Sequence, residues 1–300
     1  MCLLATVPAE AQTREAKLQH AVTEAMNGRS GAAVVLDVAT AHVLAAYRLD
    51  VAARRVAYPG SSIKPFTLMA LLQSGKLNGH SSLACKRRLQ IADHRLDCTH
   101  PPIPQLLGPA EALAYSCNFY FTSVATRISP AELRDSFLKM GFGSPTGLAP
   151  HEATGEVALA ATQQQLQLQA IGEWGVGVTP LALLNAYRKL ATLAGKNQDP
   201  ALVPVLNGLE GSTSYGMAHA AQPDASLRVA GKTGTSISDE GHWTHAWFAG
   251  FAPAEHPAIV LVVFLEKGHG GAEAAEVARQ IFAAYAKLSD SKTGSAGAPQ

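Results

Sequence analysis

The chain has 300 residues, 47% of them hydrophobic and 16% charged, which is enough apolar material to bury a core as one large domain or two closely packed lobes. The formal net charge is +1, and because no block of like charge stands out, the composition argues against a nucleic-acid partner. No run approaches the roughly 20 apolar residues that a membrane-spanning helix requires.

The N-terminus carries a short apolar run over residues 2–7, followed by Pro8 and by small residues around position 10. This pattern resembles the end of an export signal without its basic start, so residues 1–12 are interpreted as the remnant of such a signal. An ordinary frayed N-terminus is the alternative. Export predicts an extracytoplasmic location, in the periplasm or cell envelope, and a membrane anchor would then lie in an N-terminal segment missing from this sequence.

Apolar spacing predicts a first helix over residues 12–27, and two β-prone runs, 32–36 and 42–47, predict an antiparallel hairpin. A turn at residues 58–60 precedes a buried helix over 62–72. Because Pro65 is tolerated only in the first turn of a helix, this helix should begin close to Ser61. Further helices are predicted over residues 110–127, 130–140, 162–171 and 180–193.

The C-terminal part changes character, with strand-like runs at residues 226–230, 243–251 and 258–265 before an amphipathic helix over 272–288. Strands from both ends of the chain can combine into one sheet. The expected fold class is therefore α+β, an antiparallel sheet flanked by terminal helices plus a mainly helical lobe. Residues 13–288 would form this domain, and the small polar tail 289–300 is expected to be disordered.

The first candidate catalytic group is Ser61, which begins an S-x-x-K motif that ends at Lys64. Residues three apart share one face of a helix, so a neutral Lys64 amine could take the proton of the Ser61 hydroxyl. Burial would lower the lysine pKa as that role requires. The motif recurs at Ser136 to Lys139 and at residues 289–292, but these matches lack the preceding turn and are interpreted as chance.

A second motif, S-x-N, lies at Ser116, Cys117 and Asn118 on the predicted helix 110–127. A second hydroxyl near the lysine could relay a proton to a leaving amine, and the Asn118 amide could hydrogen-bond a substrate backbone. Taken alone, the triplet is more simply interpreted as polar residues on a helix surface than as part of a catalytic site.

The third motif is K-T-G-T at residues 232–235, after the strand-like run 227–230. An extended peptide could pair with a strand edge there, and Gly234 would leave room for its close approach. The charge of Lys232 suits a substrate carboxylate, as do the hydroxyls of Thr233 and Thr235. The same K-T-G triplet recurs at residues 292–294, where no strand is predicted.

These motifs, in this order, resemble those of the penicillin-binding proteins, specifically the class B type of transpeptidase domain. Similar segments extend over roughly residues 31–288, namely 59–66, 116–121, 141–143, 178–181 and 246–253. The resemblance implies the serine transpeptidase and β-lactamase fold, acylation of Ser61 by D-alanyl-D-alanine stem peptides or β-lactams, and an oxyanion hole from the backbone N–H groups of Ser61 and Thr235. It implies catalytic roles for Ser61, Lys64, Ser116, Asn118 and Lys232, no cofactor, and cell-wall synthesis proteins as candidate partners.

Several activities remain open under this resemblance. The enzyme could cross-link peptidoglycan as a D,D-transpeptidase or trim stem peptides as a D,D-carboxypeptidase. A class D-like serine β-lactamase is an alternative, but it needs a group that speeds deacylation, and no glutamate motif for that role stands out around Glu156. A non-catalytic β-lactam sensor or scaffold is the third possibility.

Two further residue types were weighed as site candidates. Cys85 and Cys98 bracket a polar stretch, which permits either a disulfide across an exposed loop or two unrelated thiols. None of the four cysteines lies in a C-x-x-C pair or at zinc-finger spacing with a histidine, and His242 and His245 would point to opposite faces of a strand. No metal site is therefore predicted.

Overall fold

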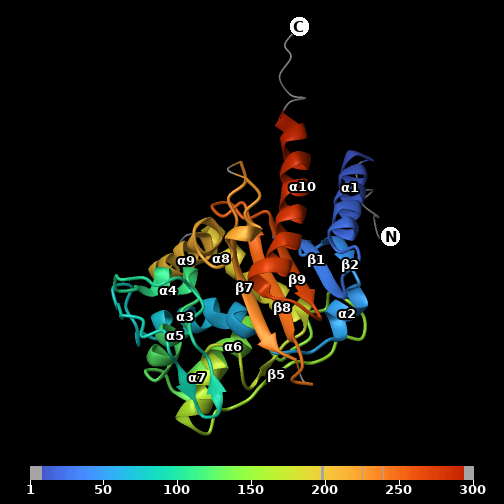
Figure 1. The fold of residues 1–300 in the computed structure, drawn as a ribbon. Coiled ribbons are helices and arrows are strands. Elements are labelled where there is room, and N and C mark those ends of the chain that lie inside the picture. Colours follow the sequence, from blue (N-terminus) through green and yellow to red (C-terminus); the bar gives the residue numbers. More distant parts are fainter. Residues whose placement is uncertain (1–8, 197–198, 225, 239, 294–300) are drawn as a thin grey trace.

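The computed structural model of the protein describes residues 9–293 apart from 197–198, 225 and 239. Within them lies a five-stranded antiparallel sheet in the order β2 (Val43–Tyr47), β1 (Gly31–Asp37), β9 (Ile259–Leu265), β8 (Thr244–Ala252) and β7 (Ala230–Ile237) (Figure 1). The two ends of the chain meet at β1 and β9, where Gly31 pairs with Leu265. The predicted α+β fold class is confirmed.

The sheet separates two hydrophobic cores because side chains alternate along each strand. On β1, Val34 faces one core and Val35 the other. On β9, Val262 and Val263 divide in the same way. Because both faces are covered, these strands consist almost entirely of apolar residues, as expected for a strand buried on both sides.

The terminal helices α1 (Ala9–Ala25) and α10 (Ala275–Thr293) lie side by side and cover one face of the sheet (Figure 1). A single π-helical turn, Gly270–Ala274, leads into α10. The other face packs against α8 (Pro180–Lys196), whose buried side is rich in leucine and alanine. The strand β7 remains at the edge of the sheet, next to the helical lobe.

The helical lobe contains α3 (Lys64–Gln73), α4 (Pro109–Ala114), α5 (Asn118–Ala125), α6 (Pro130–Met140), α7 (Gln163–Ala170) and α9 (Val203–Ser214). A short helix, α2 (Leu49–Arg54), follows the N-terminal hairpin, and two small hairpins pair β3 (Gln90–Ile91) with β4 (His94–Arg95) and β5 (Glu156–Val157) with β6 (Val176–Gly177). Local sequence fixes some boundaries. Ser129 and Glu132 form a capping box at the start of α6, and Gly141 ends that helix in the left-handed conformation.

Three predicted elements differ from the structure, and one helix was not predicted. The helix predicted over residues 110–127 is two helices, α4 and α5, with a break at Ser116. The strand predicted over 226–230 is wrong, since β7 begins only at Ala230. The K-T-G-T motif was expected after the strand and lies within it. Helix α9 was missed because Pro204, Gly208 and Gly211 lower its helix propensity. Gly208 is needed for packing, since a Cβ there would stand 2.8 Å from Leu113. Glycine therefore allows α9 to lie close to α4. The last helix continues to Thr293.

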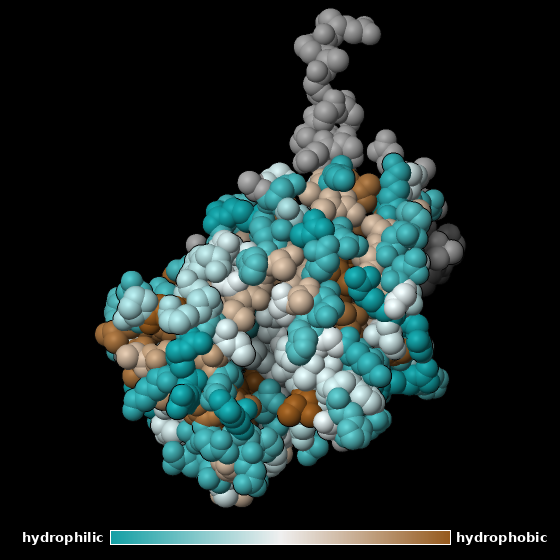
Figure 2. Space-filling model, viewed as in Figure 1, coloured by the Kyte–Doolittle hydropathy of each residue, from teal (hydrophilic) through white to brown (hydrophobic). Residues whose placement is uncertain are grey.

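The proposed terminal segments are only partly described. Of the export-signal remnant, residues 1–8 lie outside the described residues and 9–12 belong to α1. Of the tail predicted to be disordered, residues 289–293 form the end of α10, so the prediction is wrong there, and residues 294–300 also lie outside the described residues. Among the helices of the described chain, none has the length and apolar content needed to cross a bilayer. The face seen in Figure 2 is mostly hydrophilic, with apolar residues in scattered patches.

Candidate active site

Ser61 lies on a short 3₁₀ turn, Gly60–Ile63, that leads directly into α3. The turn is held from two sides. The Ser62 hydroxyl donates a 2.7 Å hydrogen bond to the carbonyl of Pro59, and the Tyr187 hydroxyl of α8 donates one of 2.9 Å to the carbonyl of Ser62. Ser61 itself is half-buried, so its hydroxyl sits on a fixed backbone with one side open.

Gly60 allows this turn to pack against β7. Its φ is +50°, and a Cβ at this position would stand 2.3 Å from the carbonyl oxygen and 3.1 Å from the backbone nitrogen of Thr235. On the other side, the Gly60 N–H donates to the carbonyl of Gly172 at 3.1 Å. No other residue type fits this position, which explains the Pro-Gly-Ser sequence. The backbone segments carrying the two predicted oxyanion donors, Ser61 and Thr235, are therefore in contact.

Lys64 is fully buried, and its ammonium group is the centre of the site. Nζ donates to the Ser116 carbonyl at 2.8 Å, to the Ser116 hydroxyl at 3.2 Å and to Asn118 Oδ1 at 2.6 Å. The structure thus brings the S-x-x-K and S-x-N motifs together. Burial lowers the pKa of Lys64 from 10.5 to about 8, so roughly a tenth of the lysine is neutral at pH 7.

The break between α4 and α5 is what directs Ser116 toward the lysine. Ser116 has a φ of +54°, an uncommon conformation for a residue with a side chain. With it, both the carbonyl and the hydroxyl of one residue contact Lys64 Nζ. Cys117 then caps α5 by accepting the Tyr120 N–H on its sulfur. The helix predicted across this motif is interrupted because the contacts to the lysine outweigh local helix propensity.

Asn118 is engaged on both ends of its amide. Oδ1 accepts from Lys64, and Nδ2 donates a 3.1 Å hydrogen bond to the carbonyl of Leu96 in the β3–β4 region. In this structure the amide therefore orients Lys64 and ties the β3–β4 segment to α5. Its predicted hydrogen bond to a substrate backbone stays a prediction.

Lys232 is also fully buried, on β7. Its ammonium donates to the carbonyl of Thr233 at 3.1 Å. The pKa of Lys232 lies well below its usual value, mainly because the lysine is buried and secondly because the positive charge of Lys64 is near. The third motif is thus electrostatically coupled to the first, which places two ammonium groups where an anionic ligand would relieve their repulsion. The Thr235 hydroxyl accepts the N–H of Gly270 at 3.0 Å.

Gly234 lies close to the backbone of two neighbouring segments. A Cβ on Gly234 would stand 2.3 Å from the Pro59 carbonyl oxygen, and a Cβ on Gly270 would stand 2.2 Å from the Gly234 carbonyl oxygen. The room that a side chain would fill is therefore occupied by the protein itself. At its Cα, Gly234 allows the Gly60–Ile63 turn to approach β7, and its predicted role in admitting a bound peptide stays a prediction.

Glu173 is a titratable residue of this region that sequence reasoning missed. It is half-buried and follows Gly172, the residue that contacts Gly60. Burial raises the pKa of Glu173 to about 7, and the charge of Lys64 acts in the opposite direction. The available signal was an acidic residue inside the glycine-rich segment 172–177.

Sequence reasoning also missed a cluster of four metal-ligand side chains. The ligand atoms of Cys85, Cys98, His100 and Cys117 all lie within 4.8 Å of one another. The three cysteines are free thiols in the structure, so the predicted alternative of a Cys85–Cys98 disulfide is not formed. The sequence predicted no metal site and did not reveal this cluster, because its residues come from separate loops; the C-x-H spacing at residues 98–100 was the one local signal.

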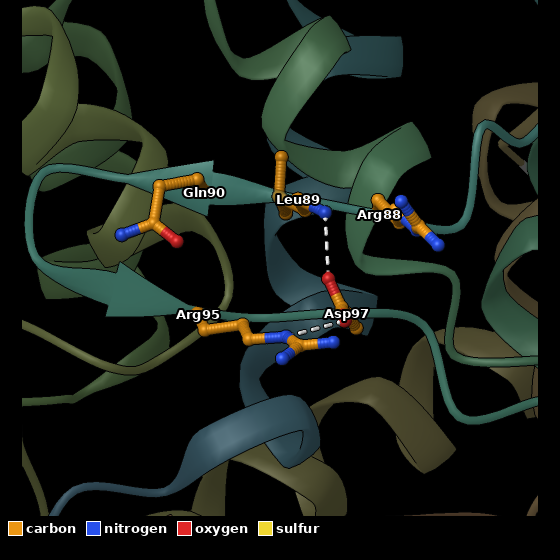
Figure 3. Close-up of a pocket in the computed structure, with 5 residues that line it drawn as sticks. All are labelled: Arg88, Leu89, Gln90, Arg95 and Asp97. Atoms are coloured by element: carbon orange, nitrogen blue, oxygen red, sulfur yellow. Dashed lines mark hydrogen bonds and ion pairs between the residues drawn. The ribbon is translucent and has the colours of Figure 1, made fainter.

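The pocket shown in Figure 3 lies on the β3–β4 hairpin and is lined by Arg88, Leu89, Gln90, Arg95 and Asp97. The Asp97 carboxylate accepts the Leu89 N–H at 2.9 Å and pairs with Arg95 at 2.7 Å. These bonds close the base of the hairpin. The pocket does not contain the catalytic candidates, and its polar side chains stabilise the segment that carries Cys85 and Cys98.

Comparison with known proteins agrees with this arrangement. A family model described as "Penicillin binding protein transpeptidase domain" matches residues 31–283. Among curated proteins, the peptidoglycan D,D-transpeptidase PbpA of Mycobacterium tuberculosis H37Rv is 26% identical over 75% of this chain and 54% of its own length. MrdA of Haemophilus influenzae is 25% identical over 91% of this chain and 55% of its own length. The chain spans about half the length of these relatives.

Solved structures share the fold. Pseudomonas aeruginosa PBP2, crystallised in complex with WCK 5153, superposes with a TM-score of 0.79 at 23% identity, covering 90% of this chain and 76% of the other. A peptidoglycan glycosyltransferase from Burkholderia ambifaria gives a TM-score of 0.79 at 22% identity, covering 95% and 97%. The matched family region contains all three motifs and the sheet that supports them. The chain therefore belongs to the penicillin-binding protein transpeptidase family.

Proposed function

We propose that the protein is a serine D,D-transpeptidase or D,D-carboxypeptidase that acts on peptidoglycan stem peptides. The observation that carries this proposal is the position of Lys64, one helical turn after Ser61 and hydrogen-bonded to both Ser116 and Asn118. A buried amine with a pKa of about 8, three residues after Ser61 at the start of the same helix, can accept the proton of the Ser61 hydroxyl.

In the first step, Ser61 Oγ attacks the carbonyl carbon of the D-alanyl-D-alanine bond while neutral Lys64 takes the hydroxyl proton. The negative charge that develops on the carbonyl oxygen is stabilised by the backbone N–H groups of Ser61 and Thr235. The C–N bond then breaks. The proton passes through Ser116 to the departing D-alanine nitrogen, which leaves an ester on Ser61 and a neutral lysine.

In the second step, an acceptor amine or a water molecule attacks the ester carbonyl. Its proton returns through Lys64 to Ser61 Oγ, so the enzyme is regenerated. An amine gives a cross-link and water gives a trimmed stem peptide. The substrate's terminal carboxylate would be held by Lys232 with the Thr233 and Thr235 hydroxyls, since an anion beside Lys232 would favour its protonated form against the burial that lowers its pKa.

β-Lactams would acylate Ser61 by the same first step, and their ring opening replaces loss of D-alanine. The match of residues 31–283 to a penicillin binding protein transpeptidase domain supports this inference. A setting outside the cytoplasm follows from the cell-wall substrate. One structural relative belongs to a complex described as coordinating polymerization and crosslinking, which supports cell-wall synthesis proteins as partners.

The proposal is tested by labelling the purified protein with fluorescent penicillin and following the adduct by mass spectrometry. A stable adduct on Ser61, absent from Ser61→Ala, supports the transpeptidase assignment. Ser136→Ala is the matched control, because Ser136 begins an S-x-x-K match inside α6, and this change should leave labelling unchanged. Folded wild-type protein that takes no label would contradict an acyl-serine mechanism.

One observation favours hydrolysis of the acyl-enzyme as the second candidate outcome, by a carboxypeptidase or a serine β-lactamase. Glu173 places a carboxyl group with a pKa of about 7 in the electrostatic field of Lys64. A partly ionised carboxyl beside the acylation site could accept a proton from water. Rapid loss of the penicillin adduct from wild-type protein would support this candidate over transpeptidation.

A further inference from the structure

We propose that Cys85, Cys98, His100 and Cys117 bind one zinc ion. The ion would join the segment around the β3–β4 hairpin, residues 85–100, to the S-x-N motif. Three thiols and one imidazole are a ligand set typical of structural zinc sites. They converge from three places in the chain: Cys85 before the hairpin, Cys98 and His100 after it, and Cys117 between Ser116 and Asn118. No disulfide satisfies any of the three sulfurs.

The distances match a tetrahedral site. Zinc with bonds of about 2.3 Å to sulfur and about 2.0 Å to nitrogen separates two sulfur ligands by about 3.8 Å and a sulfur from a nitrogen by about 3.5 Å. In the structure, Cys98 Sγ and Cys117 Sγ lie 3.8 Å apart, and Cys85 Sγ lies 3.5 Å from His100 Nε2. Two edges of the cluster therefore already have the lengths that zinc coordination would give.

The groups around the cluster orient the ligands. The Nδ1 atom of His100 is 2.7 Å from the carbonyl of Pro101, to which it can donate as N–H, leaving Nε2 with its lone pair toward the sulfurs. Each sulfur accepts a backbone N–H: that of Arg87 on Cys85 at 3.3 Å, that of Phe119 on Cys98 at 3.4 Å and that of Tyr120 on Cys117 at 3.4 Å. These backbone donors act against the burial that disfavours the thiolate forms, which are the forms that bind metal.

Burial and charge are consistent with a closed structural site. Cys98, His100 and Cys117 are at most 5% exposed, while Cys85 is half-buried and leaves a path for the ion. Three thiolates on one divalent cation carry a net charge of −1. Arg87 lies against this charge, since its guanidinium donates to the carbonyl of His100, and it is flanked by two further cations in the sequence.

The position of Cys117 gives the site a consequence for catalysis. Its neighbours on either side, Ser116 and Asn118, are the two residues that hold Lys64. Asn118 is also tied to Leu96, inside the segment that the other three ligands anchor. A metal on Cys117 would therefore hold Ser116 and Asn118 in place without touching substrate, which makes the four ligands positioning residues.

The experiment measures zinc in the 300-residue protein, purified under reducing conditions without chelator. Elemental analysis should give one zinc per chain. Replacing the zinc with Co²⁺ should give the absorption of a tetrahedral cobalt–thiolate site, a readout that needs no variant. Cys85→Ser and His100→Ala should each lower zinc content and the rate of β-lactam acylation, whereas His94→Ala, a change at an exposed position of β4 outside the cluster, should leave both unchanged.

Two outcomes would overturn the proposal. One is reduced wild-type protein that binds neither zinc nor Co²⁺ and still acylates at the full rate. The other is native protein with a disulfide between two of the three cysteines and no metal, seen as an intact mass about 2 Da below the thiol form. Cys98→Ser provides a further comparison, because a variant that folds, loses zinc and acylates normally would limit the ion to stability and contradict a positioning role.

Discussion

Lys64 and Asn118 are joined by a 2.6 Å hydrogen bond that links the start of α3 to the start of α5. The bond fixes the ammonium group at a point set by two helices. Lys64 therefore cannot be displaced without moving either the nucleophile turn or the S-x-N motif. The lysine is both the proposed proton acceptor for Ser61 and the structural centre of the site.

The first prediction concerns pH. Because burial lowers the pKa of Lys64 to about 8 and only the neutral amine can accept a proton, the acylation rate should rise with pH, with a midpoint near 8. Between pH 6 and pH 8 the neutral fraction increases about 50-fold. Stopped-flow acylation by a chromogenic β-lactam measures this profile.

Lys64→Arg is the control for this profile, since a guanidinium remains protonated throughout the range. It should show almost no acylation at any of these pH values. A wild-type rate that stays flat from pH 6 to pH 9, or an Arg variant that keeps the rising profile, would show that another group accepts the proton.

Elements with a strong local pattern could be predicted from the sequence. The apolar run of β9 indicates a strand that is buried on both faces, and the capping box at Ser129 indicates the start of a helix. Both signals come from residues that are close together in the sequence. The catalytic candidates Ser61 and Lys64 were found for the same reason, being three apart on one helix start.

The remaining features depend on contacts between distant segments. Nothing near Ser116 signals a helix break, because its conformation is imposed by Lys64. The start of β7 depends on pairing with β8, where Ala230 is opposite Phe251. The cysteine–histidine cluster joins loops whose spacing follows no local rule. Glu173 acquires its raised pKa only through burial.

The second prediction separates the two roles of Ser116. Ser116→Ala and Ser116→Gly both remove the hydroxyl that is proposed to relay a proton, so each should lower turnover of a D-alanyl-D-alanine peptide by about 10²-fold or more. Glycine adopts a φ of +54° without strain, so Ser116→Gly should be more stable than Ser116→Ala by about 1 kcal/mol. Urea unfolding and peptide turnover measure the two effects. Equal stability of the two variants would argue that Ser116 is unstrained.

The third prediction concerns Gly60. In Gly60→Ala the new methyl group would lie 2.3 Å from the Thr235 carbonyl oxygen, so we expect a loss of about 3 kcal/mol in the free energy of unfolding together with loss of acylation. Gly147→Ala is the matched control, because Gly147 also has a positive φ but nothing lies within 4 Å of a Cβ there. The control should cost about 1 kcal/mol and keep full activity. If both variants lose the same stability, the contact with β7 contributes nothing.

The fourth prediction tests the coupling between Glu173 and Lys64. Burial sets the low pKa of Lys64, and the negative charge of Glu173 is among the charges that raise it. Glu173→Gln removes that charge at nearly constant volume, so the pKa of Lys64 should fall and the rising limb of the acylation profile should move to lower pH. Acylation at pH 7 should increase about two- to threefold.

If Glu173 also accepts a proton from water, the same variant should hold the penicillin adduct longer. Glu156→Gln, at an exposed position on β5, is the control and should change neither quantity. An acylation profile that shifts to higher pH in Glu173→Gln would reverse the inferred sign of the coupling.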